Sequence, residues 1–268
     1  MQIFNEKVSG DFESDVGLMD DILRPNKSFD IIRKTMKISD ANIVMYYIDG
    51  FIKGQKLLTY IVSVKDFGDK SEGSAQRFAD MHVPAAEVDV TDSIDNIVLM
   101  VMSGCTAFFC DRFDNNAVII DLRTYPARNT EEPENDKVMR GSRDGFVETL
   151  ISNTAMIRRR IRSPELVIKY LNAGKSTRTD IALCYMDGRA DIGYVNELSA
   201  KIENLQTDSL VLGHQSLTES LIKTRWYNPF PKIRATERPD AAAATLLEGG
   251  IIVLCDNSPE AMIFPTSM

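Results

Sequence analysis

Histidine, tryptophan and paired cysteines are scarce in this sequence of 268 residues. It contains two histidines, one tryptophan and four cysteines, and no two cysteines have C-x-x-C spacing. Because zinc sites need several cysteine or histidine ligands at short spacings, a structural metal site is not expected. The four cysteines lie in or beside apolar runs, which predicts buried, reduced thiols in a reducing compartment. They are Cys105, Cys110, Cys184 and Cys255.

Long hydrophobic runs and an excess of positive charge are also missing. No stretch has the roughly 18 to 20 apolar residues of a membrane-spanning helix. The N-terminal segment is polar and acidic, so a secretory signal is not expected. The formal net charge of −8 disfavours a general nucleic-acid binder. Hydrophobic residues make up 44% of the chain, which is enough for substantial cores, and the length predicts two lobes.

The most charge-dense segment runs from Tyr125 to Arg162. It begins with acidic residues and ends with a cluster of arginines. Near its middle, Ser142 or Asp144 could cap the free backbone N–H groups of a helix. Apolar residues then recur at helical spacing, which predicts a helix of about five turns that leads from one lobe into the other. These residues are Phe146, Leu150, Ile151, Ala155 and Ile157.

Two short blocks of the first half return in the second half. IVMYYIDG begins at Ile43 and IALCYMDG at Ile181, which are 138 positions apart (181 − 43). SGCTAFFC and GGIIVLC end at Cys110 and Cys255, which are 145 positions apart (255 − 110). Chance similarity of short apolar runs is the alternative, but the shared order favours internal duplication. Alternating helices and strands in each half predict an α/β fold of two similar lobes, each with a mixed sheet covered by helices.

The expected organisation has four parts. Residues 1–27 form an acidic lead-in, 28–124 the first lobe, 125–162 the charged connector and helix, and 163–268 the second lobe. Helical spacing predicts helices over 29–39, 51–65 and 164–173, whereas the polar residues 68–80 predict a loop. Strands are expected over 42–48, 106–110, 117–122, 180–186, 251–255 and 261–264.

No group of residues forms a recognisable catalytic motif. Gly174-Lys175-Ser176 resembles the end of a phosphate-binding loop, but Lys169 stands where the pattern needs glycine, so Gly174 is interpreted as a helix C-cap. Neither His82 nor His214 accompanies a nucleophile. Aspartates that follow strands could line a ligand cleft, but turn chemistry is the favoured interpretation. They are Asp49, Asp111, Asp187 and Asp256. Catalytic, cofactor-binding and metal-binding residues are therefore not expected.

Several short sequence blocks follow one another in a distinctive order and spacing. They are Asp121–Pro126, Glu131–Pro133, Arg140–Phe146, Asn153–Ala155, Arg158–Arg162, Asn228–Pro231, Thr236–Asp240 and Leu246–Gly249. These blocks resemble the N-terminal soluble domain of the spore germination protein A-subunit (GerA) family. The resemblance covers most of Leu23 to Thr266 and is strongest from Asp121 onward. Asp136 and Gly250 depart from the family pattern, which usually has glutamate and a longer polar residue there.

This resemblance implies a two-lobed α/β domain on the cytoplasmic, or spore-core, side of the spore inner membrane. A membrane domain would follow Met268. Members of the family act in endospore germination, assemble with partner subunits and are thought to form oligomeric ion channels. The expected function is therefore not enzymatic: the domain would serve subunit assembly and coupling to an ion-channel membrane domain, without a cofactor. Whether the parent is an accessory sporulation protein or a germinant-receptor subunit stays open.

Two other functions are compatible with the residues. A two-lobed sensor module could close on a small ligand, and an enzyme is the third and least supported possibility. The arginine cluster could bind phosphate or nucleic acid, but the nearby acidic residues favour salt bridges within the domain or to another subunit. The residues expected to serve as scaffold or interface are Arg140, Arg143, Glu148, Arg158, Arg162, Glu237 and Arg238.

Overall fold

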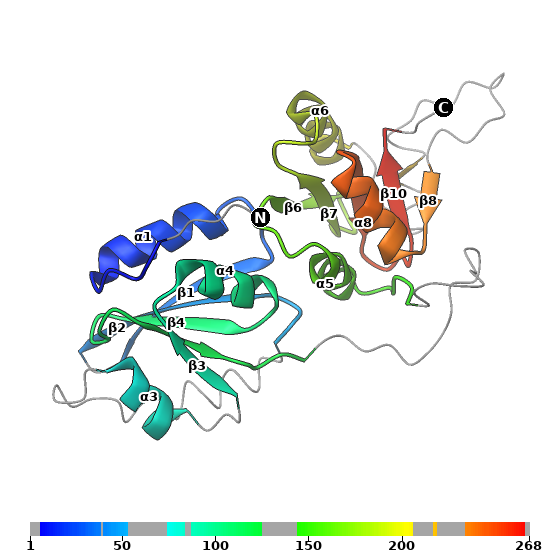
Figure 1. The fold of residues 1–268 in the computed structure, drawn as a ribbon. Helices are drawn as coiled ribbons and strands as arrows, with labels where there is room; N and C mark the ends of the chain where they lie inside the picture. Colours follow the sequence, from blue (N-terminus) through cyan, green and yellow to red (C-terminus); the bar gives the residue numbers. More distant parts are fainter. Residues whose placement is uncertain are drawn as a thin grey trace, which may run out of the picture. The chain divides into compact units, whose positions relative to one another are not determined.

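The computed structural model describes residues 6–38, 40–52, 74–83, 87–124, 144–205, 217–218 and 234–265. The chain divides into two compact units (Figure 1). The first comprises Met1–Pro126 and Arg162–Pro164, and the second comprises Ala127–Ile161 and Glu165–Met268. Within the described residues, no helix is both long enough and apolar enough to cross a membrane.

The first unit is a five-stranded antiparallel sheet with helices on its faces. Its strand order is β1-β2-β4-β5-β3, and every neighbouring pair is antiparallel. The strands are β1 (Ile31–Ile38), β2 (Ala41–Ile48), β3 (Val88–Thr91), β4 (Thr106–Cys110) and β5 (Ala117–Ile120). The helices are α1 (Phe12–Leu23), α3 (Ala75–His82) and α4 (Ile94–Met102).

The second unit has the same topology. Its strand order is β6-β7-β9-β10-β8, again with antiparallel neighbours throughout. The strands are β6 (Leu166–Ala173), β7 (Thr179–Met186), β8 (Arg234–Thr236), β9 (Ile251–Cys255) and β10 (Ala261–Phe264). The helices are α5 (Leu150–Arg160), α6 (Ile192–Glu203) and α8 (Pro239–Leu247).

The register of the central strands confirms the internal duplication. Ile43 pairs with Cys110 in the first unit, and Ile181 pairs with Cys255 in the second. These are the residues that marked the repeat in the sequence. The helices follow the same offsets: α5 begins 138 positions after α1 (150 − 12), and α8 begins 145 positions after α4 (239 − 94). The two units therefore share their topology and the register of their central strands.

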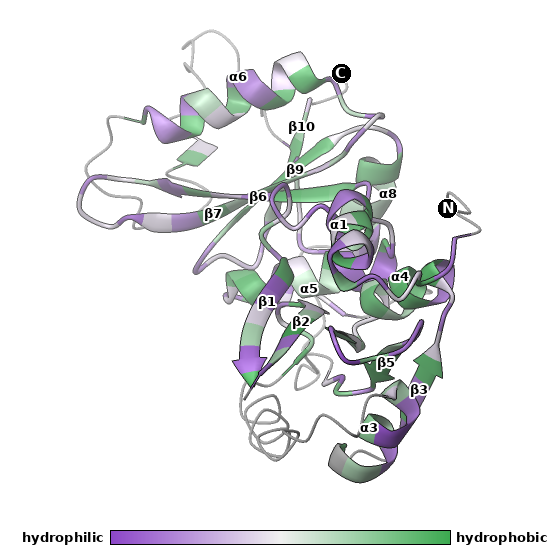
Figure 2. Ribbon diagram, turned by 90° about the vertical axis from the view of Figure 1, so that its left-hand side faces the viewer, coloured by the Kyte–Doolittle hydropathy of each residue, from purple (hydrophilic) through white to green (hydrophobic). Residues whose placement is uncertain are grey.

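Each central sheet is covered on both faces. In the second unit, Val195, Leu198 and Ile202 of α6 pack in one core cluster with residues from one face of the sheet, whereas α5 and α8 contact β7 and β9. All five residues of β9 are buried, so this strand shows no alternation of apolar and polar residues. Figure 2 shows hydrophobic colouring along β9 and alternating hydrophilic and hydrophobic bands along α6.

The α/β class and the two similar lobes are thus confirmed, but the mixed sheets are wrong. Both sheets are antiparallel in every pair. Alternation of helices and strands along a chain does not by itself set strand direction. Here β1 and β6 join β2 and β7 through short turns, and β4 and β9 join the following strands as hairpins, so that each connection reverses the chain.

The helices predicted over 29–39 and 164–173 are in fact the strands β1 and β6. Each pairs along its whole length with the following strand, and such pairing outweighs apolar spacing that fits a helix by chance. Gly174 is therefore not a helix C-cap. It lies in the turn between β6 and β7 with φ +90°, which glycine adopts without steric cost.

Two other segments are more ordered than predicted. The acidic lead-in 1–27 contains α1, and α3 begins at Ala75 within the predicted loop 68–80, with Ser74 Oγ accepting from Arg77 N. The predicted connector helix is shorter: α5 has 11 residues and belongs to the second unit. Some predicted features lie outside the described residues. They are Arg140, Ser142, Arg143, His214, Asn228–Pro231 and the part of the predicted helix 51–65 that follows Ile52.

In both units a glycine lies where the end of a helix comes close to the turn after the second strand. Gly249 follows α8 with φ +92°, and a Cβ added there would lie 2.8 Å from the carbonyl oxygen of Arg189. Gly104 follows α4 with φ +101°, and its added Cβ would lie 2.7 Å from the ring of Phe51. Arg189 and Phe51 are themselves equivalent positions (189 − 51 = 138). The helix end and the turn after the second strand therefore meet at a point where no side chain fits.

The four cysteines are buried and free, as predicted. Burial raises the pKa of Cys105 and of Cys110 to about 11 and that of Cys255 to about 12. Because the thiolate is the reactive form, thiols with such high pKa values react slowly even where a reagent reaches them.

We expect Gly249→Ala to destabilise the protein more than Gly188→Ala. Gly188 has φ +81° with no atom within 4 Å of an added Cβ, so its substitution should cost about 1 kcal/mol of backbone strain. At Gly249 the clash with a backbone carbonyl adds to the same strain, giving about 2 to 4 kcal/mol. Urea unfolding followed by circular dichroism measures both, and equal costs would show that the Arg189 contact imposes no constraint.

We further expect none of the four cysteines to react with Ellman's reagent in the native protein, and all four to react in guanidinium chloride. A positive control is Met81→Cys, because Met81 is 60% exposed. Rapid labelling of a native cysteine without unfolding would contradict the buried placement.

Candidate functional site

Four of the seven residues predicted as scaffold or interface lie in or next to α5 and α8 of the second unit. Of the seven, Glu148, Arg158, Glu237 and Arg238 lie there. Arg162 belongs to the first unit, and Arg140 and Arg143 are outside the described residues. We call the surrounding set of Asp144, Arg160, Arg238 and Asp240 the arginine–aspartate cluster.

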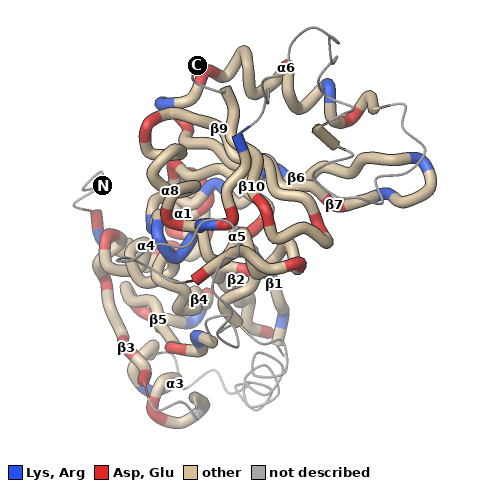
Figure 3. The backbone as a smooth tube through the Cα atoms, turned by 90° about the vertical axis from the view of Figure 1, so that its right-hand side faces the viewer, with Lys and Arg blue, Asp and Glu red and all other residues tan. Residues whose placement is uncertain are grey.

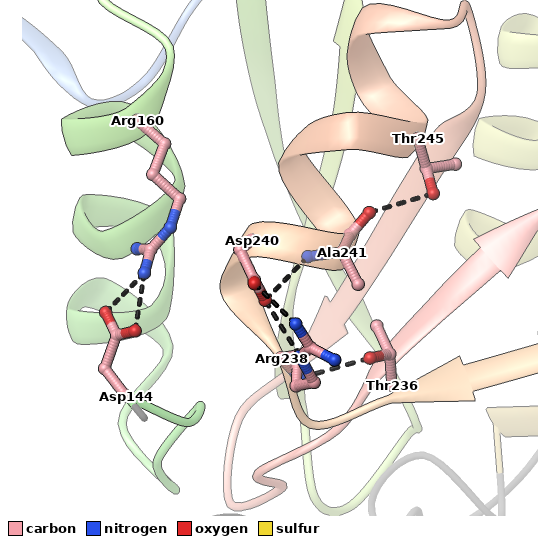
Figure 4. A network of polar contacts seen from close by, with 7 residues as sticks. All are labelled: Asp144, Arg160, Thr236, Arg238, Asp240, Ala241 and Thr245. Carbon is pink, nitrogen blue, oxygen red and sulfur yellow. Dashed lines mark hydrogen bonds and ion pairs between the residues drawn. The ribbon is translucent and has the colours of Figure 1, made fainter. Parts of the chain in front are cut away.

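This cluster contains two ion pairs (Figure 4). Arg160 Nη2, at the end of α5, lies 2.6 Å and 2.5 Å from the two carboxylate oxygens of Asp144. Arg238 donates from Nε and Nη2 to the two oxygens of Asp240, at 3.1 Å and 2.6 Å. Such two-point contacts fix the orientation of both groups. Asp144 therefore pairs with the arginine cluster and does not cap a helix.

The second pair sits at the first turn of α8. Arg238 occupies the N-cap position and Pro239 is the first helical residue, so Asp240 lies in the first turn of the helix. The pKa of Asp240 lies below its ordinary value, mainly because Arg238 hydrogen-bonds to it, and Arg160 lowers it further. Both arginines thus act on the same carboxylate, and negative charge at this helix end is favourable.

A backbone contact joins the segment before α5 to the turn before α8. Phe146 N donates to the carbonyl of Glu237 at 2.8 Å, and Phe146 itself is buried. Arg238 N donates to Thr236 Oγ1 at 3.1 Å. The main chain of Glu237 therefore joins two segments that are about 90 residues apart in the sequence.

The start of α5 is held by residues that are distant in the sequence. Leu150 N donates to Asp256 Oδ1 at 3.1 Å, and Asn257 N donates to the carbonyl of Glu148 at 2.8 Å. Thr149 occupies the N-cap position without a side-chain cap bond, so the carboxylate that follows β9 supplies the missing acceptor. The side chain of Glu148 is exposed.

Asn153 fixes the entry into the same helix. It is fully buried, its Oδ1 accepts from Val147 N at 2.8 Å, and its Nδ2 donates to the carbonyl of Val147 at 2.5 Å. In the first unit Asp15 holds Ser9 N in the same way at 2.8 Å, and both pairs are six residues apart. The repeat therefore extends to the approach of each first helix.

Arg158 is the largest fully buried side chain of the chain's described part. Its Nη2 donates to the carbonyl of Leu166, the first residue of β6, at 2.9 Å. A buried arginine needs such acceptors, because an unpaired buried charge is strongly destabilising. Arg158 is thus placed inside the second unit, whereas the side chains of Glu148 and Arg162 are exposed.

Arg162 lies in the short Arg162–Pro164 segment of the first unit. Its Nη1 is 3.4 Å from Oγ of Ser103, the C-cap residue of α4. Arg24 Nη2 donates to the carbonyl of Pro164 at 2.8 Å. Two arginine contacts therefore hold this segment against the ends of α1 and α4.

Three of the four aspartates that follow strands accept backbone hydrogen bonds through their carboxylates. Asp256 caps α5, Asp111 accepts from Asn42 N and Nδ2, and Asp49 accepts from Gly50 N. Asp187 N donates to the carbonyl of Glu165. Among the described residues no group of three histidines, cysteines or carboxylates is placed to hold a metal ion. Figure 3 shows acidic and basic residues interspersed along the backbone.

Reasoning from the sequence missed Asn153, Asp256 and Asp144 as the residues that order this site. The repeat could have pointed to Asn153, because a shift by 138 positions places Asn153 on Asp15 and α5 on α1. Contacts such as Asp256 to Leu150 join residues 106 positions apart and have no local pattern.

We expect Asn153→Ala to lower the free energy of unfolding by about 2 to 3 kcal/mol, because it removes two hydrogen bonds and leaves Val147 unsatisfied. The matched control is Asn172→Ala, whose exposed amide donates to Asp180 at 2.6 Å, and which should cost less than about 0.5 kcal/mol. Denaturant unfolding compares the two variants, and similar costs would show that the Val147 contact is dispensable.

Comparison with known proteins gives consistent matches. Residues 19–268 match the family described as Bacillus/Clostridium GerA spore germination protein. Stage V sporulation protein AF of Bacillus subtilis (strain 168) is 34% identical over 243 residues, which cover 90% of this chain and 49% of that protein. Spore germination protein KA of the same organism is 30% identical, covering 89% and 44%. Uncharacterized membrane protein YfkQ of the same organism is 30% identical, covering 82% and 42%. The chain thus spans about half the length of these relatives.

A solved structure has the same fold. The N-terminal domain of the A subunit of the Bacillus megaterium spore germinant receptor GerK3 superimposes with a TM-score of 0.65 at 24% identity, covering 100% of this chain and 99% of that one. This confirms the two-lobed architecture. Because the family match extends over nearly the whole chain, the chain belongs to the GerA spore germination protein family.

Proposed function

We propose that this chain is the N-terminal domain of a spore germination protein and serves subunit assembly and coupling to a C-terminal membrane domain during endospore germination. The observation that carries the proposal is the extent of the matches. The family match covers residues 19–268, yet the chain covers only 49% and 44% of two relatives named for sporulation and germination. The remaining half of such a protein would supply the membrane part, and a third relative is described as a membrane protein.

The site supports a scaffold role. Arg158 joins α5 to the first residue of β6, and Arg160 joins the end of α5 to Asp144 in the segment before it. The backbone bond from Phe146 to Glu237 joins that segment to the turn before α8. A rigid unit of this kind transmits a displacement, because packed elements move together instead of deforming continuously. In this proposal the protein lies in the spore inner membrane as a homo-oligomer with other germination proteins and couples to an ion channel, with the domain on the spore-core side.

Glu148 is the described candidate that is best placed for contact with another subunit. Its side chain is exposed, and its backbone is fixed by the bond from Asn257 N. An exposed charge on a fixed backbone meets a partner at low entropic cost. Arg143, from the same family-like block as Asp144, is the corresponding candidate outside the described residues.

We expect Glu148→Lys and Arg143→Glu in the full-length protein to lower the assembled fraction and slow germination. Glu203→Lys, an equal charge change at an exposed position of α6, should leave both unchanged. Assembly is measured by cross-linking in membranes and germination by the loss of spore refractility. The thermal stability of the isolated 268-residue chain should not change in any of the three variants.

Two results would count against this proposal. Wild-type assembly and germination in both candidate variants would remove the charged segment from subunit contact. A thermal-shift screen of amino acids, sugars and nucleotides tests the sensor alternative, because a ligand that binds only the folded state raises its stability. A clear shift with one compound would make ligand sensing the leading function.

A further inference from the structure

One end of the second unit carries exposed apolar side chains. Leu247, the last residue of α8, is 45% exposed, and Ile192, the first residue of α6, is 42% exposed. The two helix ends are neighbours, because Arg189 Nη1 donates to the carbonyl of Leu247 at 3.0 Å and Gly249 lies against the carbonyl of Arg189. We call Arg189, Ile192, Leu247 and Gly249 the helix-end surface.

In the first unit, the positions equivalent to Arg189 and Leu247 are buried. By the repeat offsets, Phe51 corresponds to Arg189 and Met102 to Leu247, and both are fully buried. The chain that follows β5 contributes to this environment. Thr124 N donates to the carbonyl of Phe51 at 2.7 Å, and Arg123 forms a β-bridge with Ile52.

The contact between this exit segment and the glycine is close. A Cβ on Gly104 would lie 3.3 Å from Cγ of Arg123. Leu122, two residues after β5, is buried in the core cluster that includes Phe108 and Ile120. The segment after β5 is therefore held by backbone contacts of Arg123 and Thr124 and by the buried side chain of Leu122.

The second unit offers the same acceptor at the same place. Phe264 of β10 pairs with Ile251 as Ile120 of β5 pairs with Thr106, so the chain leaves both sheets at equivalent positions. Within the described part of the second unit, no backbone N–H donates to the carbonyl of Arg189. An apolar surface beside an open backbone acceptor is suited to an extended segment that adds main-chain hydrogen bonds and buries apolar side chains.

We propose that the helix-end surface is the docking site of the polypeptide that follows the second unit in the full-length protein. That segment donates a backbone N–H to the carbonyl of Arg189, as Thr124 does to the carbonyl of Phe51 in the first unit, and it covers Leu247 and Ile192. The chain covers 49% and 44% of two relatives, and the GerK3 structure of the same fold is an N-terminal domain. The inference rests on the proposed function, because it needs a further half of the protein to follow this domain. It names the surface through which that half contacts the domain.

Cysteine labelling tests this docking site directly, since the native cysteines are buried. The reporter is Leu247→Cys, and the matched control is Met81→Cys on α3 of the first unit, where Met81 is 60% exposed. Each variant is made in the 268-residue chain and in the full-length protein in membranes. Maleimide labelling at position 247 should be at least about tenfold slower in the full-length protein, because docking must open before the reagent enters. Labelling at position 81 should be equally fast in both.

Equal labelling of position 247 in both proteins would overturn the proposal. So would protection in the 268-residue chain that appears only at high protein concentration, because a second copy would then cover the surface. Germination with full labelling at position 247 would leave the proposed function intact and remove only the docking site. If position 247 is protected but loss of the protein does not affect germination, the docking site stands and the proposed function fails.

Discussion

The pairing of two buried strands at the centre of each sheet is the interaction on which the rest of the structure depends. In the second unit β7 pairs with β9, and all five residues of β9 are buried. In the first unit β2 pairs with β4, which is equally buried. A shift of one residue in this pairing would move every side chain of the shifted strand to the opposite face of the sheet. Helices pack against both faces, so such a shift would disturb both cores. The register is therefore the same in both copies, and the helices are positioned from it.

The charged site follows from this pairing. The end of β9 delivers Asp256 to the first N–H groups of α5, and the start of β6 offers the carbonyl of Leu166 to Arg158. Arg160 can then reach Asp144. These arginines are scattered around a single helix, and each has a different partner, so the cluster does not present one common basic face. A run of arginines that could bind phosphate or nucleic acid by its sequence therefore makes a hydrogen bond and an ion pair within its own unit.

The central strands were predictable because their apolar runs are long, flanked by turn residues and repeated. Strands β4, β9 and β10 have the bounds expected from the sequence. Edge strands β1 and β6 were not predictable in the same way, because one side is unpaired and their exposed polar residues imitate helical spacing. Of the candidate site, the positions of the arginines were evident, but their acceptors are carbonyls and carboxylates from distant elements, which composition and spacing do not encode.

The two copies differ where their surroundings differ. Asp15 and Asn153 are both buried and both accept a bond from the backbone N–H six residues earlier, but the asparagine also donates to the carbonyl of Val147. A neutral amide satisfies both backbone groups there, whereas a carboxylate would face a carbonyl oxygen and leave one group unsatisfied. Phe51 and Arg189 differ in the same manner: the buried copy is aromatic and the exposed copy is charged. The two copies thus kept the positions of these contacts in the fold, whereas the side chains at each position changed with the groups around them.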